Sequence, residues 1–297
     1  MSLPDRPEPR PTDAHKGTAG RVLVLAGSRW MPGAGVLAAT GALRAGAGLV
    51  TLAGRSETAL DHAVGARPEL LLWQLEDRMD ASALEAEFEE RRFDAVVVGP
   101  GLPANKRTER LLAGLLAAWD GALVLDAGAL SVLAADKALT EAVRARTQLP
   151  AILTPHPGEA AQLLGGAAIS GFRASIGATE AERGRAAAEL ALRFNAITVL
   201  KGAGTLVADV TGERIWRCSA GNPGMATGGT GDVLAGMLGA LVSEVADPST
   251  LWHRARTAVH WHALAGDLAA ADLGQRALLA SDVADALGPA ELEGPWA

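Results

Sequence analysis

The chain has 297 residues, of which 27 are Lys or Arg and 34 are Asp or Glu, so its formal net charge is −7. This acidic balance excludes a general nucleic-acid or anionic-membrane binder, because such proteins present a basic surface. Hydrophobic residues make up 49% of the chain and charged residues 21%, which is typical of a folded domain. A single cysteine, Cys218, excludes an intramolecular disulfide or a cysteine zinc site and favours the cytoplasm.

The first 14 residues, MSLPDRPEPRPTDA, contain prolines at four positions and few apolar side chains. This composition predicts a leader that is disordered or tethered to the surface. It lacks the apolar stretch of a secretory signal, and no later apolar run is long enough to span a bilayer. We expect residues 15–297 to form one domain, because no linker or internal repeat divides them.

From Arg21 onward, short apolar runs alternate with longer stretches rich in Ala, Leu, Glu and Arg. The runs predicted as strands are 21–26, 49–53, 94–98, 122–125, 151–153 and 197–200. The stretches predicted as helices are 36–44, 81–91, 108–118, 134–146, 179–194, 232–245 and 253–271. Continuously apolar strands separated by helices predict an α/β fold with a mostly parallel central sheet and helices on both faces. Two late runs, 205–208 and 214–217, predict an antiparallel β-hairpin at one sheet edge.

Glycine, proline and polar residues gather where the predicted strands end. Open α/β sheets bind their ligands outside the carboxyl ends of the strands, so these loops are the candidate site. They are Gly27, Gly99–Gly101, Asp126, Thr154–Glu159 and Lys201–Gly202.

The segment Gly221–Asp232 (GNPGMATGGTGD) leads directly into an apolar helix. Glycines at a helix start let backbone N–H groups approach an anion, and the helix dipole favours negative charge there, so Gly228–Gly231 predict a phosphoryl site. We interpret Asp232 as a general base that takes a proton from an acceptor hydroxyl during phosphoryl transfer. The alternative is that Asp232 only caps the helix. No Gly-Lys-Ser/Thr follows the glycines, so this is not a Walker A loop.

This segment resembles the signature of the ADP-dependent NAD(P)H-hydrate dehydratases, a family of the ribokinase-like superfamily. The resemblance extends over about residues 15–290 and is also carried by His15–Gly20, Gly33–Gly35, Ala42–Thr51, Val98–Leu102, Thr154–Glu159, Leu200–Ala203 and His262–Asp267. It implies a ribokinase-like fold and a lyase that uses ADP to dehydrate (S)-NADHX or (S)-NADPHX, the hydrates of NADH and NADPH. AMP and phosphate would be the other products, and Mg²⁺ the implied cofactor.

The resemblance also implies roles for individual residues. Asp232 would be the catalytic base, and Ala34, Gly101 and His156 would contact the hydrate. The nucleotide-binding residues would be Lys201, Gly202, Ala203, Gly204, Thr205, Asn222, Gly228, Gly229, Thr230 and Gly231. Glu159 either caps the next helix or helps to hold Mg²⁺ through water, and Asp126 is either structural or near the metal. The simpler alternatives are a tight turn at Gly101, packing at Ala34 and a charged turn at Lys201–Thr205.

Two positions depart from the family pattern. Pro103 stands where the family often has glycine, and Gly128 stands where it usually has aspartate. These departures leave hydrate binding and a carboxylate–metal contact at Gly128 open.

The expected partners follow from the same resemblance. It implies a cytoplasmic homo-oligomer, a tetramer, that works beside a separate NAD(P)HX epimerase and binds neither nucleic acid nor membrane. One alternative is an ATP-dependent kinase of the same fold that acts on hydroxyethylthiazole or hydroxymethylpyrimidine. Another is a nucleotide-binding regulatory protein with a decayed site. The Thr154–Glu159 motif disfavours the kinase, and the intact Gly-Thr-Gly-Asp sequence disfavours decay.

Overall fold

A computed structural model describes residues 2–76, 81–165, 179–245 and 247–297. Its strands form one nine-stranded sheet in the order β3-β2-β1-β4-β5-β6-β7-β8-β9. The strands are β1 (Arg21–Leu25), β2 (Leu49–Gly54), β3 (Leu71–Gln74), β4 (Ala95–Val98), β5 (Ala122–Leu125), β6 (Ile152–Leu153), β7 (Ile197–Leu200), β8 (Leu206–Ala208) and β9 (Ile215–Arg217). Strands β1 to β7 run parallel, whereas β8 and β9 form the antiparallel hairpin at the edge. The predicted fold class is therefore confirmed.

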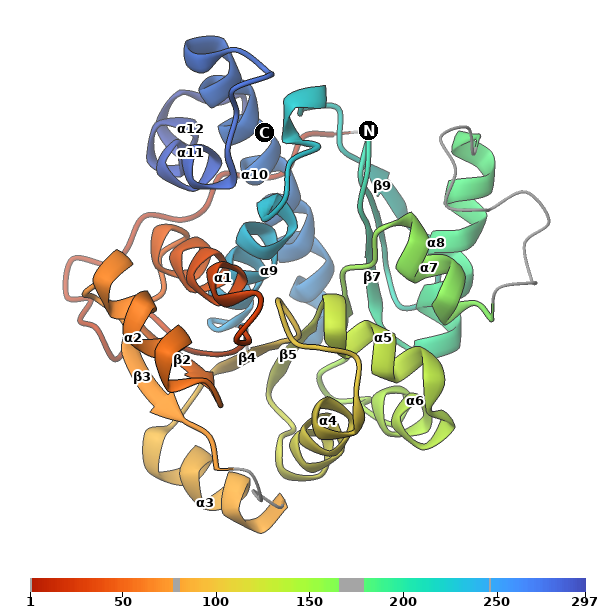
Figure 1. The fold of residues 1–297 in the computed structure, drawn as a ribbon. Helices are drawn as coiled ribbons and strands as arrows, with labels where there is room; N and C mark the ends of the chain where they lie inside the picture. Colours follow the sequence, from red (N-terminus) through yellow and green to blue (C-terminus); the bar gives the residue numbers. More distant parts are fainter. Residues whose placement is uncertain (1, 77–80, 166–178, 246) are drawn as a thin grey trace.

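Helices cover both faces of this sheet (Figure 1). One face carries α1 (Pro32–Arg44), α2 (Glu57–Ala66), α9 (Thr230–Val242), α10 (Leu251–Leu273), α11 (Ala280–Asp285) and α12 (Leu287–Glu293). The other carries α3 (Ala81–Arg91), α4 (Lys106–Ala118), α5 (Ala127–Ala135), α6 (Lys137–Arg144), α7 (Pro157–Leu163) and α8 (Glu180–Phe194). Within the described ranges, no helix combines the length and apolar character needed to cross a bilayer.

The continuous apolar runs follow from this double cover. Val22 and Val24 of β1 belong to the hydrophobic core on the α1 and α9 face, whereas Leu23 and Leu25 belong to the core on the opposite face. Successive side chains of a strand point to opposite faces, so a strand covered on both sides needs apolar residues at every position.

Several short elements differ from the prediction. Strand β3 was not predicted, because at this sheet edge Leu71 remains 49% exposed while Trp73 is buried. The helix predicted over 134–146 corresponds mainly to α6, and most of α5 lies before that range and was not predicted. Asp136 separates them, because its carboxylate accepts hydrogen bonds from the backbone N–H groups of Ala138 and Leu139 and so caps α6. Helices α2, α7, α11 and α12 are ten residues or shorter and were also not predicted.

The N-terminal segment lies against the end of the chain. The carbonyl oxygen of Ser2 accepts hydrogen bonds from Trp216 Nε1 at 3.2 Å and Arg256 Nη2 at 3.0 Å. The backbone N–H of Ala297 donates to the Pro4 carbonyl at 3.0 Å. Ser2 and Pro4 are therefore bonded to later parts of the chain.

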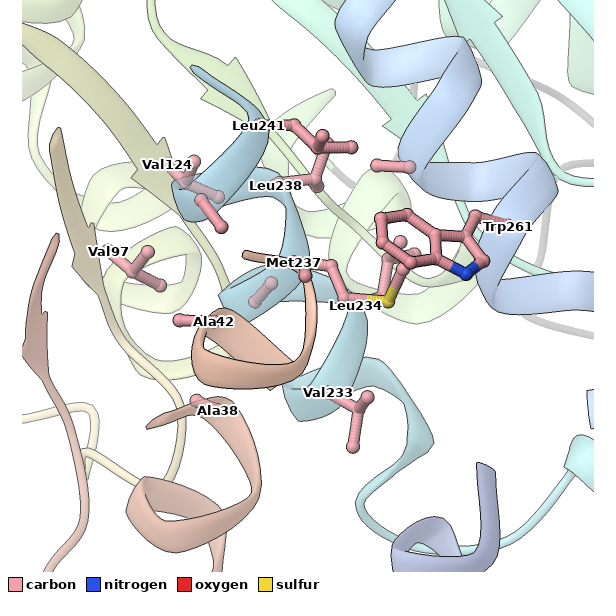
Figure 2. Packing of buried hydrophobic residues seen from close by; sticks show 14 of the residues in the cluster. Ala38, Ala42, Val97, Val124, Val233, Leu234, Met237, Leu238, Leu241 and Trp261 are labelled. Carbon is pink, nitrogen blue, oxygen red and sulfur yellow. The ribbon is translucent and has the colours of Figure 1, made fainter. Parts of the chain in front are cut away.

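Helices α1 and α9 pack so closely that their backbones touch. A methyl group at Gly236 of α9 would overlap the carbonyl oxygen of Ala38, and one at Gly41 of α1 would overlap that of Val233. Figure 2 shows the small side chains of Ala38 and Ala42 beside α9. Because both helices begin at the carboxyl edge of the sheet, this contact fixes the start of α9 relative to the loop that precedes α1.

We expect Gly236→Ala to lower the free energy of unfolding by about 1–3 kcal/mol, because the methyl group must push α1 and α9 apart. Urea unfolding would measure the change. The control is Gly184→Ala in α8, where no described atom lies within 4 Å of the added methyl group. That control should gain about 0.5–1 kcal/mol, because alanine favours the helix. Equal stability of Gly236→Ala and wild type would contradict the close contact.

Candidate active site

Four charged side chains meet at the carboxyl edge of the sheet, although they are far apart in the sequence. Asp126 follows β5, Glu159 begins α7 after β6, Lys201 follows β7 and Asp232 lies in the first turn of α9. Lys201 Nζ is 2.6 Å from Asp126 Oδ1, and Lys201 also interacts electrostatically with Glu159 and Asp232. We call these four residues the carboxylate cluster. Three of its members were predicted as site residues, and the fourth, Asp126, was left between a structural role and a place near the metal.

Asp126 is the anchor of the carboxylate cluster. It is 1% exposed and accepts hydrogen bonds from Thr154 Oγ1 at 2.7 Å and from Lys201 Nζ at 2.6 Å. Asp126 occupies the N-cap position of α5, yet its side chain makes no capping bond. Its carboxylate therefore faces the site rather than the helix that it precedes.

Lys201 stays a cation despite its burial. Burial by itself lowers the pKa of Lys201, but the carboxylates of Asp126, Glu159 and Asp232 together raise it above its ordinary value. A Cβ atom at Gly231 would lie 3.2 Å from Lys201 Nζ, so the ammonium group lies over the first turn of α9. Lys201 and the glycine-rich loop therefore face the same small space, which suits a phosphoryl group.

Asp232 is half-buried, and its pKa is raised to about 7. Burial is the main cause, and the negative charge of Asp126 adds to it, while Lys201 lowers the pKa in part. A carboxylate with this pKa can take and release a proton near neutral pH, as a general base must. The N-cap of α9 is Gly229, and no side chain caps this helix. The structure therefore gives no support to the alternative that Asp232 serves as a cap.

The glycine-rich loop adopts a conformation that presents backbone N–H groups at the start of α9. Gly229 has a φ of +97°, and a side chain there would overlap Leu37 of α1. Gly228 is exposed, and among the described residues nothing lies within 4 Å of its missing side chain. The Thr230 hydroxyl donates to the carbonyl oxygens of Met225 and Thr227, so this side chain holds the loop, and only its backbone N–H remains for a ligand.

Asn222 anchors the glycine-rich loop to α10. Its Nδ2 donates to the Gly266 carbonyl and to Asp267 Oδ1, both at 2.9 Å, and its Oδ1 accepts from the Gly224 N–H. Asp267 also accepts from the Gly221 N–H at 2.8 Å. The side-chain polar groups of Asn222 are thus bonded within the protein, and its predicted support of the nucleotide stays a prediction.

His156 and Glu159 form a capping box at the start of α7. His156 Nδ1 accepts from the N–H groups of Gly158 and Glu159, and Glu159 Oε2 accepts from the His156 N–H at 2.8 Å. The imidazole side chain stays 57% exposed, so one edge of the ring remains open to a ligand. Burial raises the pKa of Glu159, which Lys201 partly opposes. Glu159 thus both caps α7 and belongs to the carboxylate cluster.

Ala34 and Gly101 lie side by side where β1 and β4 end. Gly101 has a φ of +66°, and a Cβ atom there would lie 2.7 Å from the Ala34 Cβ and 2.8 Å from the Met31 carbonyl oxygen. The backbone N–H of Gly27 donates to the Pro100 carbonyl at 2.8 Å, which joins the two loops. The two residues predicted to contact the hydrate are therefore brought together.

The departure at Gly128 has a steric reason. A side chain there would overlap the Leu102 carbonyl oxygen, so this backbone arrangement admits no aspartate at position 128. Asp126, two residues earlier, is the carboxylate that faces the site.

The loop Lys201–Thr205 is braced by two arginines. Arg183 Nη1 donates to the Ala203 carbonyl, and a Cβ atom at Gly204 would lie 2.6 Å from Arg217 Nε. Gly202 and Ala203 are exposed, so their backbone is accessible to a nucleotide. The Thr205 hydroxyl donates to the Gly202 carbonyl and closes the turn.

His262 is a neighbour of the site for which the sequence analysis predicted no role. It is fully buried in α10 and interacts with the backbone of Thr230 at the start of α9. Burial lowers the pKa of His262 to about 4, so the ring is neutral at physiological pH. His260, two residues earlier, instead bonds the Pro295 carbonyl, so the two histidines do not face a common site.

We expect Asp232→Asn to be more stable than wild type at pH 8, by up to about 4 kcal/mol. Because the pKa of Asp232 is higher in the folded protein, the stability that its proton contributes below about pH 4 is lost as the pH rises towards 7. Asparagine does not ionise, so the variant avoids this loss. Urea unfolding at pH 4 and pH 8 would show a small difference at pH 4 and a large one at pH 8.

The control for this comparison is Asp136→Asn, at an N-cap that asparagine also fills well, and its stability should follow wild type at both pH values. If Asp232→Asn also follows wild type at both, its carboxyl is not perturbed as described.

Comparison with known proteins agrees with this geometry. Residues 22–288 match the model of the NAD(P)H-hydrate dehydratase family. The bifunctional NAD(P)H-hydrate repair enzyme of Coxiella burnetii is 40% identical over 274 residues, which cover 92% of this chain but 51% of that protein. The chain thus spans about half the length of the first curated relatives that it matches.

Two matches from Bacillus subtilis, one to a curated sequence and one to a crystal structure, cover nearly the whole of the matched chains. The ADP-dependent (S)-NAD(P)H-hydrate dehydratase is 34% identical over 94% of this chain and 91% of its own. A crystal structure of the ADP/ATP-dependent NAD(P)H-hydrate dehydratase, co-crystallised with ATP and Mg²⁺, superposes with a TM-score of 0.76 and 30% identity, covering 98% of both chains. The sheet, the glycine-rich loop and these matches together show that the chain belongs to the NAD(P)H-hydrate dehydratase family and has its ribokinase-like fold.

Proposed function

We propose that the protein is an ADP-dependent (S)-NAD(P)H-hydrate dehydratase, which restores NADH or NADPH from the hydrate. The observation that carries this proposal is the position of Asp232. Its carboxyl has a pKa of about 7, lies in the first turn of α9 and interacts electrostatically with Lys201, beside the proposed phosphoryl space. A base in this place can take a proton from a hydroxyl while that hydroxyl receives a phosphoryl group.

The two substrates would lie along the carboxyl edge of the sheet. The loop Lys201–Thr205 after β7 would hold the adenosine of ADP, and the N–H groups of Gly228–Gly231 with Lys201 would hold its phosphates. The hydrate would lie over the ends of β4 and β1, beside Gly101 and Ala34. This order places the C6 hydroxyl of the hydrate next to the β-phosphate of ADP, with Asp232 beside both.

The proposed reaction removes water in two stages. Asp232 takes the proton of the C6 hydroxyl, whose oxygen bonds to the β-phosphorus of ADP, and the bond from that phosphorus to AMP breaks. The C6–O bond then breaks and phosphate leaves with the electron pair. Loss of a proton from C5 restores the C5–C6 double bond. Phosphorylation is the useful step, because hydroxide is a poor leaving group at neutral pH and phosphate is a better one.

Mg²⁺ would neutralise part of the charge on the ADP phosphates. In the described part of the chain, no group of three or more His, Cys, Asp or Glu side chains could enclose a metal ion. This suits Mg²⁺, which usually binds through substrate phosphates, water and one or two carboxylates. Glu159, which faces Lys201 from the start of α7, is the carboxylate that we assign to this role through water. Asp126 is already bonded to Lys201 and Thr154.

The cellular setting is part of the same proposal. We place the enzyme in the cytoplasm, where reduced nicotinamide cofactors are consumed, as a homotetramer. An epimerase that supplies the S form of the hydrate would act in the same pathway. The bifunctional names of relatives about twice as long as the matched region support such a linked activity.

The direct test incubates the protein with NADHX, Mg²⁺ and either ADP or ATP, and follows the absorbance of reduced nicotinamide. We expect NADH to reappear together with equal amounts of AMP and phosphate when ADP is the donor. A stable phosphorylated product would instead indicate a kinase. No recovery of NADH with either nucleotide would contradict the proposed function.

We expect Asp232→Asn to lower kcat by roughly 10²–10⁴-fold, because the hydroxyl loses its general base. Calorimetric binding of ADP should be retained, since the backbone N–H groups and Lys201 are unchanged. Asp136→Asn, at the N-cap of α6 and outside the carboxylate cluster, serves as the control and should keep its activity. Near-normal turnover in Asp232→Asn would remove this residue from the role of base.

A further inference from the structure

A cavity lies beside the proposed hydrate site, over the carboxyl ends of β1, β2 and β3. It has a volume of about 320 Å³, which falls in the range of small-molecule sites. Gly27 and Leu102 line it. Gly27 lies against Gly101, and Leu102 follows Gly101 in the sequence. The cavity therefore continues directly from the place where Ala34 and Gly101 meet.

The walls of this cavity combine apolar and basic groups. Leu25, Leu102 and Leu111 form apolar wall, and three arginines, Arg29, Arg55 and Arg107, also line the cavity. Among the described lining residues none is acidic. Arg55 and Arg107 also interact with other groups of the protein. A bound anion would therefore share these two arginines with the protein groups that they already contact. An apolar wall suits a nucleobase, and guanidinium groups suit a phosphate group.

The strand order indicates which part of a ligand reaches the cavity. Along the carboxyl edge, Lys201 follows β7, Asp126 follows β5, Gly101 follows β4 and Gly27 follows β1, while the cavity extends onwards over β2 and β3. If ADP occupies the β7 end and the nicotinamide lies at β4 and β1, the rest of the dinucleotide must extend away from ADP. The direction away from ADP leads into this cavity.

We propose that the cavity binds the adenylate half of the dinucleotide hydrate. Arg29 and Arg107 would contact the phosphate of that half, and the leucines would cover its adenine. This inference rests on the proposed dehydratase function and assigns the part of the substrate that does not react. The neighbouring hollow at Pro32, Thr58 and His62 shares Arg29 but has no leucine wall for a base, and so fits adenine less well.

The test compares two substrates, NADHX and the hydrate of reduced nicotinamide mononucleotide, which has the same reacting ring but no adenylate. For Arg107→Ala and Arg29→Ala we expect KM for NADHX to rise about tenfold, because one charged contact to phosphate is lost. KM for the mononucleotide hydrate and both kcat values should stay as in wild type. The matched control is Arg110→Ala, on the same helix as Arg107, exposed and outside the cavity lining.

The possible outcomes distinguish a failure of this inference from a failure of the proposed dehydratase function. An unchanged KM for NADHX in both variants, with wild-type dehydration intact, would overturn the inference alone. An equal rise in KM for both substrates would also overturn it, because the arginines would then act on the site as a whole. Failure of the wild-type protein to dehydrate either hydrate would overturn the proposed function and the inference together.

Discussion

The buried ion pair between Lys201 and Asp126 is the interaction on which the site depends. Three carboxylates, those of Asp126, Glu159 and Asp232, surround a single ammonium group at the sheet edge. One cation cannot neutralise three anions. The carboxylate that interacts least with Lys201 therefore keeps a negative charge that is not neutralised. That group is Asp232, since Asp126 is bonded directly to Lys201 and Glu159 is bonded to the His156 N–H. Burial is the main cause of the raised pKa of Asp232, and the negative charges of Asp126 and Glu159, which Lys201 only partly offsets, raise it further.

This arrangement needs accurate placement of α9 against strands that it does not follow in sequence. Gly41 and Gly236 let α1 and α9 approach until their backbones touch, and Gly229 lets the loop turn beside Leu37. Asn222 and Asp267 tie the other end of the same loop to α10. Asp232, the proposed base, is thus held from both sides, and the glycines contribute through contact as much as through their freedom of φ.

The sequence alone predicted most of the sheet, because a strand buried on both faces must be apolar at every position. It did not predict β3, where Leu71 is exposed and only Trp73 is well buried. Motif resemblance placed Asp232 and Lys201 in one site, and the structure brings them together. It left Asp126 between a structural role and a place near the metal. The contact of Asp126 with Lys201, 75 residues later, could not be predicted from any local pattern. Similarly, no local pattern could show that Asn222 is bonded to α10.

A net charge of −7 and an acidic site would both repel the phosphates that the proposed reaction needs. The structure resolves this conflict locally, because the first-turn N–H groups of α9 and the Lys201 ammonium group face one space. Their attraction acts at short range, where burial reduces solvent screening, whereas the protein's net charge is screened over about 10 Å. A phosphate bound there adds negative charge beside Asp232 and so favours its protonated form. In the proposed reaction, the proton taken from the acceptor hydroxyl would therefore be held most firmly while the donor phosphate is bound, which would link proton transfer to the presence of both substrates.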